Sequence, residues 1–441
     1  MTKLLIKGGR VIDPTAQRDG AFDVFIERGK IAGLEPSIPA TPSASLRVAS
    51  RAESRDANGA KMIDAHGQFV VPGLVDLHAH LRQPGREDQE TIETGCLAAL
   101  RGGFTTICAM PNTTPPVDHR GVVDLIHQEA SRLGLATVRA VGAVTKGRQG
   151  RELTDFGELF DAGCVALSDD GSPVTDSLLM RRALEYAKIF NRPLIQHAED
   201  PTLVAGGVMH EGIVSTTLGL RGIPSEAESV LVGRDIALAE LTGGWVHFAH
   251  LSCAKSIELV RQAKRRGVRI TCEVTPHHLA LTHEAVGEFD TSAKVNPPLR
   301  TEQDRVSLIE GLRDGTVDCI ATDHAPHTDW EKDADFDSAP FGISGLETAL
   351  GVCVETLIKP GVLTWPQLIE ALSAKPAKIA GIDAGTLRVG AVADITIIDP
   401  TMSWTVDPQR FVSKGRHSPF AGRTLTGMVV QVLRRGGAVW P

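Results

Sequence analysis

The chain has 441 residues, of which 42% are apolar and 23% charged, and its formal net charge is −8 at pH 7. These values are typical of a globular protein with a sizeable core, and the acidic balance without a dense Lys/Arg run argues against nucleic-acid binding. The sequence has no run of about 18 apolar residues, no signal-peptide pattern, and seven scattered cysteines without a Cys-x-x-Cys pair. We therefore expect a soluble cytoplasmic protein with free, buried thiols.

The first part of the chain predicts short strands. Residues 3–13 and 21–35 alternate apolar and polar side chains around Gly-Gly and Arg-Gly-Lys turns, and residues 61–73 form a further strand-like run. Residues 36–60 are rich in Ser, Ala and Pro and lack apolar periodicity, which predicts a solvated loop.

Residues 71–385 predict alternating strands and amphipathic helices. Eight apolar runs are expected to be strands: 74–81, 105–112, 137–144, 164–171, 193–200, 245–252, 269–278 and 319–326. Helical stretches such as 90–103 and 176–190 lie between them and place apolar residues three or four positions apart. This pattern predicts an α/β fold, a (β/α)8 TIM-type barrel. A doubly wound sheet would also alternate, but no G-x-G-x-x-G follows the first strand.

The end of the chain returns to strands. After a last helical stretch over 364–381, residues 390–400 and 428–440 again have strand-like patterns. We expect residues 1–70 and 386–441 to form one small β-sandwich domain beside the barrel. Two independent β caps would produce the same pattern.

Polar side chains collect at the predicted strand ends. In such a barrel these ends face the active site, and residues two apart on a strand, such as His78 and His80, point the same way. The other candidates are His197, His250, Asp169, Asp170, Asp323 and His324. Each alone is explained by a core histidine or a helix cap, but together they indicate a metal site. Imidazole with carboxylate suits Zn²⁺, with Mn²⁺, Co²⁺ or Fe²⁺ as alternatives, and the number of ligands favours two ions.

The motifs PGLVDLHAHLRQPG, MPNTTPP, SDDG, HAED, NPPLR, ATDHAPH and APFGISGLE resemble the amidohydrolase superfamily and, within it, the dihydroorotase family. The matches run in order along nearly the whole chain. The resemblance implies a cyclic amidohydrolase that reversibly hydrolyses (S)-dihydroorotate to N-carbamoyl-L-aspartate in pyrimidine biosynthesis, with two Zn²⁺ ions per subunit, or one. It also implies a homodimer and leaves an association with aspartate transcarbamoylase open.

The resemblance assigns roles to individual residues. His78 and His80 would hold one metal ion, His197 and His250 the other, and Asp323 would bind the first ion and act as the catalytic acid/base. The substrate contacts would be Arg82, Asn112, Asn296, His327 and the Phe341-Gly342 backbone. Many superfamily members bridge their metals with a carboxylated lysine, but the fourth strand has no lysine. The bridge would then be Asp170, with Asp169 as the alternative.

Several residues near these motifs have a second interpretation. His277 and His278, expected at the end of the seventh strand, and His324 are interpreted as supporting residues, while Asp76 is expected to orient a neighbouring imidazole. Residues 328–340 predict either a mobile loop over the site or a plain solvated loop. The competing functions are an allantoinase or hydantoinase, and an inactive dihydroorotase-like scaffold for aspartate transcarbamoylase.

Overall fold

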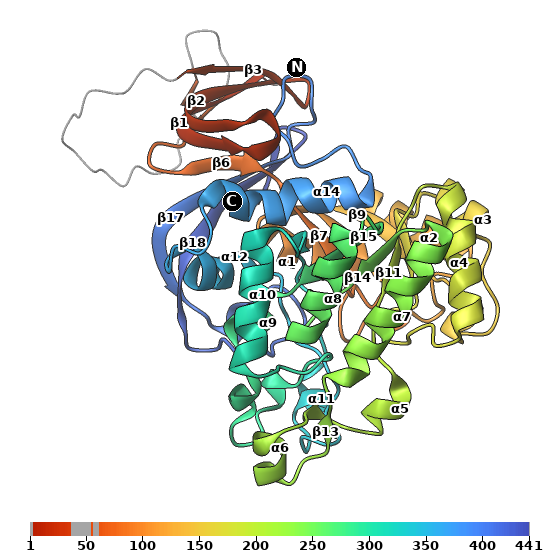
Figure 1. Ribbon diagram of the computed structural model, residues 1–441. Helices are drawn as coiled ribbons and strands as arrows, with labels where there is room; N and C mark the ends of the chain where they lie inside the picture. The colour runs from red at the N-terminus through yellow and green to blue at the C-terminus, as the bar shows by residue number, and fades with distance from the viewer. Residues whose placement is uncertain (1–2, 37–53, 56–60, 441) are drawn as a thin grey trace.

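The molecule consists of a barrel and a separate sheet, described for residues 3–36, 54–55 and 61–440 in a computed structural model. Figure 1 shows the sheet, built from both ends of the chain, at one end of the helix-covered barrel. These two parts confirm the predicted fold class. Among the described residues, no helix is long and apolar enough to cross a membrane.

Eight parallel strands form the barrel wall in the order β16-β15-β14-β11-β10-β9-β8-β7. Their bounds are β7 (Leu74–Ala79), β8 (Phe104–Ala109), β9 (Thr137–Gly142), β10 (Ala166–Ser168), β11 (Leu194–Gln196), β14 (Val246–Phe248), β15 (Ile270–Val274) and β16 (Cys319–Ile320). A bridge between Ala79 and His324, and the hydrogen bond from His80 N to His324 O (2.8 Å), bring the end of the last strand back to the first. Every residue of β7 and β8 is buried, as expected for parallel strands covered on both faces.

Long helices surround this wall. They are α1 (Ile92–Arg101), α2 (Arg120–Leu133), α4 (Ser177–Ile189), α7 (Glu226–Thr242), α8 (Ala254–Arg265) and α10 (Glu302–Asp314). In α2, Val122, Ile126 and Ala130 recur at four-residue spacing and are buried, so one apolar stripe faces the strands. The helix ends at Gly134, whose φ of 68° is a left-handed conformation that glycine adopts without steric penalty.

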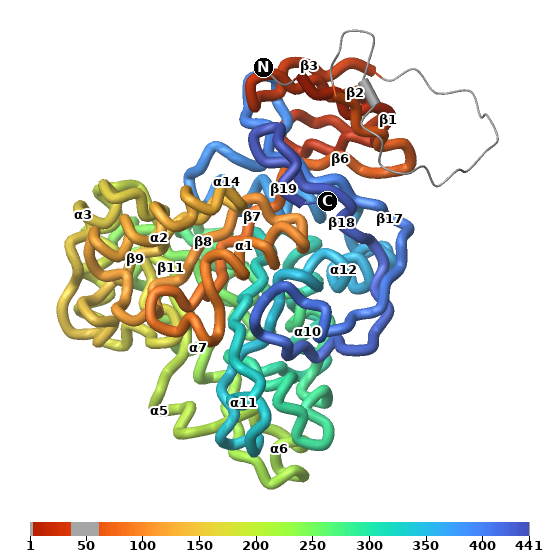
Figure 2. Tube along the Cα trace, turned by 180° about the vertical axis from the view of Figure 1, so that it is seen from behind, coloured from red at the N-terminus to blue at the C-terminus, as the bar shows by residue number. Residues whose placement is uncertain are grey.

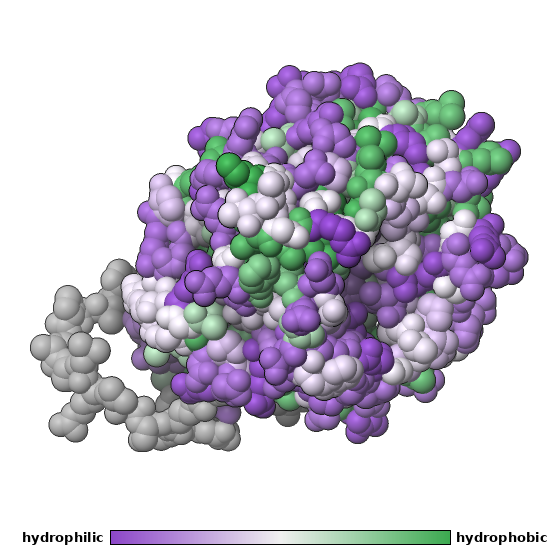
Figure 3. All heavy atoms as spheres, turned by 90° about the horizontal axis from the view of Figure 1, so that it is seen from below, coloured by the Kyte–Doolittle hydropathy of each residue, from purple (hydrophilic) through white to green (hydrophobic). Residues whose placement is uncertain are grey.

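Shorter elements lie mostly in the loops. They are α3 (Phe156–Asp161), α5 (Pro201–Val204), α6 (Ile213–Leu218), α9 (Pro276–Ala280), α11 (Asp329–Lys332), α12 (Ala349–Cys353), α13 (Trp365–Ile369), α14 (Lys375–Ala380), and the paired strands β12 (Met209–His210) and β13 (Gly222–Ile223). A π-helical turn over Glu370–Ala374 joins α13 to α14. The loops with α5, α6 and α11 follow the carboxyl ends of barrel strands, and Figure 3 views this face, which is hollowed and carries both hydrophilic and hydrophobic residues.

The separate sheet joins the two ends of the chain. Its order is β19-β18-β17-β6-β1-β2-β3, with β5 also paired to β1 and to the two-residue β4. The bounds are β1 (Lys3–Asp13), β2 (Arg18–Glu27), β3 (Lys30–Pro36), β4 (Ser54–Arg55), β5 (Lys61–Asp64), β6 (Phe69–Pro72), β17 (Ile395–Thr405), β18 (Thr424–Arg434) and β19 (Gly437–Trp440). The antiparallel pairing of β6 with β17 makes one sheet of both termini, as Figure 2 shows from behind.

One predicted strand end is wrong, and one predicted loop falls almost entirely on residues outside the described part of the chain. The seventh barrel strand ends at Val274, and Pro276–Ala280 is a short helix, so the prediction of a strand through residue 278 is wrong. The helix begins there because the Thr275 side chain accepts a hydrogen bond from His278 N and Pro276 occupies the first turn. The loop predicted for 36–60 lies almost entirely outside the described residues. All seven cysteines are free and buried, as expected.

Candidate active site

Imidazoles and carboxylates meet at the carboxyl end of the barrel. His78 Nε2 lies 3.4 Å from Asp170 Oδ1 and 3.6 Å from Asp323 Oδ1. His80 Nε2 lies 3.5 Å from Asp170 Oδ2 and 3.2 Å from Asp323 Oδ1. The donor atoms of His78, His80 and Asp323 all lie within 4.8 Å of one another, which is close enough to share one ion.

A second group of donor atoms surrounds Asp170. Asp170 Oδ1 lies 3.7 Å from His197 Nδ1 and 3.6 Å from His250 Nε2. Among the described residues, Asp170 Oδ1 and His78 Nε2 are buried and have no hydrogen-bond partner. Such groups are costly to bury without a ligand. This donor set therefore fits a divalent metal site.

Asp170 and Asp169 have different surroundings. Burial raises the pKa of Asp170, but the nearby imidazoles of His78, His197 and His250 lower it further, so the pKa lies well below its ordinary value. Asp169 instead accepts hydrogen bonds from Val144 N (2.8 Å), Thr145 N (3.0 Å) and the Thr145 hydroxyl. Asp169 is thus occupied in holding the loop after β9, which favours Asp170 over Asp169 as the bridge.

Three residues at this site have strained backbone conformations. Arg82, His250 and Asp323 have φ values of 59°, 32° and 46°, in the left-handed region that non-glycine residues rarely adopt. Each such residue costs about 1–3 kcal/mol, so the surrounding structure must hold it in place. These backbone conformations direct the three side chains into one cavity, which all three line.

The sequence prediction did not include Glu273, which supports His78. Its carboxylate lies 2.9 Å from His78 Nδ1 and 3.1 Å from His247 Nε2, in the barrel interior. Burial raises the pKa of Glu273, but hydrogen bonds from His247 and His78 outweigh it and lower the pKa to about 2. The charged carboxylate fixes the ring of His78, as is usual for metal-binding imidazoles. The available signal in the sequence was that Glu273 is the one charged residue of the otherwise largely apolar strand β15.

The predicted substrate contacts line one cavity of about 360 Å³ beside the metal-ligand cluster. They are Arg82, Asn112, Asn296, His327, Phe341 and Gly342, together with His80, Asp170, His197, His250 and Asp323. Asn112 Oδ1 lies 2.8 Å from His80 Nδ1, and the buried Asn296 Oδ1 has no hydrogen-bond partner among the described residues. The structure thus brings the predicted site residues together. His78 is fully buried and does not line the cavity, but it lies next to Asp170 and Asp323.

His327 connects the cavity wall to the segment that carries Phe341. Gln89 Nε2 donates to His327 Nδ1 (3.0 Å), which leaves Nε2–H to donate to the Phe341 carbonyl (2.8 Å). Arg82 Nε donates to the Pro326 carbonyl (3.2 Å), which holds the guanidinium at the cavity. Burial lowers the pKa of Arg82 to about 10, so the guanidinium remains charged at neutral pH.

Two buried lysines hold the segment over 328–342. Lys332, 1% exposed, donates to the carbonyls of Pro340 (3.0 Å) and Gly342 (2.9 Å). Lys294 Nζ donates to the carbonyls of Phe336 (2.5 Å) and Asp337 (3.2 Å). The segment is therefore anchored from inside at Lys332 and Phe336, while most of its other residues are exposed.

The neighbouring histidines and Asp76 have other partners. His324 lies between Glu90, 3.1 Å away, and Gly345 N, which donates to its Nδ1 (3.2 Å). His278 contacts Thr275 and the Pro297 carbonyl, at 2.7 and 2.9 Å. Asp76 accepts hydrogen bonds from Thr322 N and Oγ1 and from the backbone N of His78. The imidazole of His78 is oriented by Glu273, not by Asp76.

Barrel and site together have the arrangement of a metal-dependent hydrolase: a (β/α)8-type wall with a cluster of histidines and aspartates beside a cavity at the carboxyl end of the strands. A family model described as Dihydro-orotase-like matches residues 67–256. Dihydroorotases from Pelotomaculum thermopropionicum and Syntrophus aciditrophicus are 53% and 48% identical, covering 97% and 99% of this chain and 96% and 99% of theirs. The chain belongs to the dihydroorotase family.

A solved structure of the wider class shares the fold. The L-hydantoinase (dihydropyrimidinase) from Arthrobacter aurescens superposes with a TM-score of 0.85 at 26% identity, covering 100% of this chain and 96% of that one. The likeness extends over barrel and sheet alike.

Proposed function

We propose that the chain is a dihydroorotase, which reversibly hydrolyses dihydroorotate to N-carbamoyl-aspartate. The observation that carries this proposal is the cavity in which Arg82 and Asn112 stand beside the metal-ligand cluster. A guanidinium fork and an amide match the carboxylate of dihydroorotate in charge and geometry.

The metal site is proposed to hold two Zn²⁺ ions. His78, His80 and Asp323 would hold one, His197 and His250 the other, and Asp170 would lie between them. When bound, the ions polarise the ring carbonyl and lower the pKa of a water molecule at the site. The alternative of a single ion leaves the second group of imidazoles without a role.

The side chains then have separate tasks. Arg82, Asn112 and His327 bind the substrate carboxylate, and Asn296 with the Phe341-Gly342 backbone positions the ring. Water adds to the ring carbonyl carbon, and the Asp323 carboxylate takes its proton. Asp323 then delivers this proton to the ring nitrogen as the C–N bond breaks. Asp323 lines the cavity, so its carboxylate reaches a bound substrate directly.

Hydantoinase activity is the competing proposal. The Arthrobacter aurescens likeness supports the class, but β10 and the residues that follow it read Ala-Leu-Ser-Asp-Asp and offer no lysine for a carboxylated bridge. An inactive scaffold is disfavoured because the proposed ligands are all present and lie together.

The test is a metal analysis of the purified protein combined with assays on dihydroorotate, N-carbamoyl-aspartate and hydantoin. We expect one to two divalent ions per chain, turnover in both directions between the first two compounds, and little on hydantoin. Turnover of hydantoin without turnover of dihydroorotate would replace this proposal with its competitor.

Three proposals about organisation follow from the family. Residues 1–70 with 386–441 would form the small β domain and 71–385 the barrel, the chain would be a homodimer, and it would accept aspartate transcarbamoylase as a partner. Light scattering of the protein alone and after mixing with the transcarbamoylase measures both associations.

A further inference from the structure

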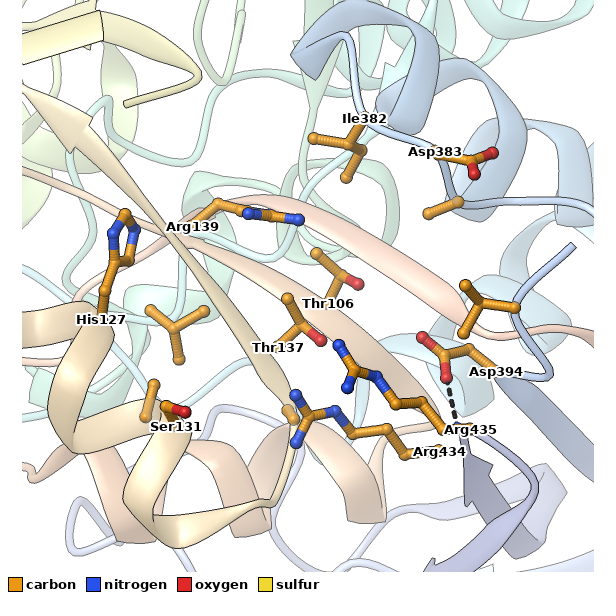
Figure 4. A pocket seen from close by; sticks show the side chains of 15 residues that line it. Thr106, His127, Ser131, Thr137, Arg139, Ile382, Asp383, Asp394, Arg434 and Arg435 are labelled. Carbon is orange, nitrogen blue, oxygen red and sulfur yellow. Dashed lines mark hydrogen bonds between the residues drawn. The ribbon is translucent and has the colours of Figure 1, made fainter. Parts of the chain in front are cut away.

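A second cavity lies at the opposite end of the barrel from the metal-ligand cluster. It has a volume of about 360 Å³ and lies between the first residues of β9, helix α2 and the ends of the terminal sheet. Thr137 and Arg139 line it from β9, and Arg434 and Arg435 line it from the end of β18. Figure 4 shows these side chains converging from separate elements on one space.

Three guanidinium groups line this cavity without a hydrogen-bond partner among the described residues; those of Arg139 and Arg434 are partly buried and that of Arg435 is exposed. Among the described residues, the side chains of Arg139, Arg434 and Arg435 make no hydrogen bond or ion pair, and the Nε atoms of Arg139 and Arg434 are buried without a partner. Burying such donors unsatisfied is costly, and guanidinium groups usually find a carboxylate or phosphate. An anion in the cavity would satisfy them.

The remaining charges of the cavity leave room for that anion. Asp394 accepts a hydrogen bond from Arg435 N (2.7 Å), and Asp383 lies at the exposed rim. Burial lowers the pKa of Arg434, Asp394 opposes this, and Arg435 and Arg139 lower it again, as expected for crowded cations. Three guanidinium groups thus face two carboxylates, one of which already binds backbone.

The cavity is larger than a bare ion requires. Besides the arginines it offers the hydroxyls of Thr106 and Thr137 and the apolar side chains of Ile382 and Val392. Planar forks that can each make two parallel hydrogen bonds recognise an oxyanion group, while the apolar side chains suit a small organic body.

We propose that this cavity binds a small metabolite bearing an oxyanion group, a phosphate or a carboxylate, which bridges the barrel and the terminal sheet through Arg139 and Arg434. The binding is independent of the proposed dihydroorotase activity, because the site lies at the other end of the strands. Bound ligand would raise the midpoint of thermal unfolding, since it stabilises only the folded protein.

Calorimetric titration of the full chain at constant ionic strength tests this. The probes are AMP and inorganic phosphate for the phosphate source and succinate for the carboxylate source. We expect saturable binding of one class, with the Kd weakened on the order of tenfold or more in Arg139→Gln and in Arg434→Gln. The matched controls are Arg151→Gln, at an exposed arginine, and Arg82→Ala, in the other cavity, and both should bind as the unaltered chain does.

Each outcome decides the proposal. If the unaltered chain shows no saturable binding of any probe, the proposal is overturned without reference to the variants. If binding persists unchanged in Arg139→Gln and Arg434→Gln, the ligand does not use this cavity and the proposal is wrong; its loss in Arg82→Ala would then assign it to the metal-side cavity. Because dihydroorotate turnover is measured separately, failure of this site and failure of the proposed function remain distinguishable.

Discussion

At the scale of single residues, we expect the two aspartates of the cluster, Asp170 and Asp323, to have different roles. Asp323 Oδ1 lies 3.2 Å from His80 Nε2, at the cavity wall, and Asp170 is surrounded by four imidazoles. Both carry a carboxylate at the proposed ions and both line the cavity, but only Asp323 is proposed to exchange a proton with a bound ring.

Substituting each aspartate by asparagine therefore separates the two roles. Asp323→Asn keeps its shape and one ligand oxygen but loses its basic site, so turnover should fall by roughly 10²–10⁴ while metal content stays. Asp170→Asn weakens a ligand shared between two ions, so metal content itself should fall. The measurements are metal content and kcat for both variants. If both keep two metals and lose activity equally, Asp170 is not the bridge.

Arg82 is expected to act on substrate binding. Arg82→Ala should raise KM for dihydroorotate. The loss of binding free energy should be on the order of 2–5 kcal/mol, because the desolvated substrate carboxylate loses its charged partner. Metal content should not change, since the side-chain hydrogen bonds of Arg82 go to Pro326 and His327 and not to a proposed ligand of the ions. Arg151→Ala, at an exposed arginine, is the control and should leave KM unaltered. Normal KM in Arg82→Ala would remove Arg82 as the carboxylate anchor.

At the scale of elements, the strands could be predicted from the sequence and several connections could not. The strands around Leu74–Ala79 and Phe104–Ala109 have period and composition typical of buried parallel strands, because their packing is local to the wall. The helix at Pro276–Ala280 is too short for a periodic signal. Glu273 acquires its role only when β7 brings His78 beside it, which no local pattern encodes.

The segment over 328–342 shows the same limit. Its acidic composition predicts solvent exposure, yet Phe336 is 4% and Lys332 1% exposed. The contacts that bury Lys332 come from backbone carbonyls at positions 340 and 342, and such carbonyls leave no trace in the side-chain pattern.

Lys332 should make stability depend on pH. Burial, and then the charge of Lys294, lower the pKa of Lys332 from its ordinary 10.5 to about 7. Between these values the unfolded chain binds more protons than the folded one, so folded-state stability should rise with pH from about 7 to 10.5. The limiting slope is about 1.4 kcal/mol per pH unit.

Lys332→Met removes this contribution. The midpoint of thermal unfolding of the unaltered chain, relative to that of Lys332→Met, should rise as the pH is raised from 7 toward 9. Lys255→Met, at an exposed lysine, is the control and should show no such trend. Parallel curves for the unaltered chain and Lys332→Met would show that Lys332 is protonated in the folded state throughout.

At the scale of the whole molecule, the proposed metal site connects strands that are distant in sequence. His78 lies in β7 and His80 follows it, Asp170 follows β10, His197 follows β11 and His250 follows β14. Asp323 follows β16 and lies beside β7, where the barrel closes through Ala79 and His324. Ions held by these residues would therefore link the barrel wall across its closing seam.

Removing the metal should consequently lower both activity and stability. Ions that bind the folded chain stabilise it by about 2.7 kcal/mol at a free concentration one hundred times the Kd, so chelation should lower the midpoint of thermal unfolding. Turnover of dihydroorotate should fall with it, and both should return when Zn²⁺ is added after the chelator is removed. His78→Ala, which lacks one ligand, should show a smaller change on chelation. Metal-free protein that keeps full activity and an unaltered unfolding midpoint would contradict the metal site itself. The buried His78 Nε2 and Asp170 Oδ1, which have no hydrogen-bond partner among the described residues, would then be stable without a cation.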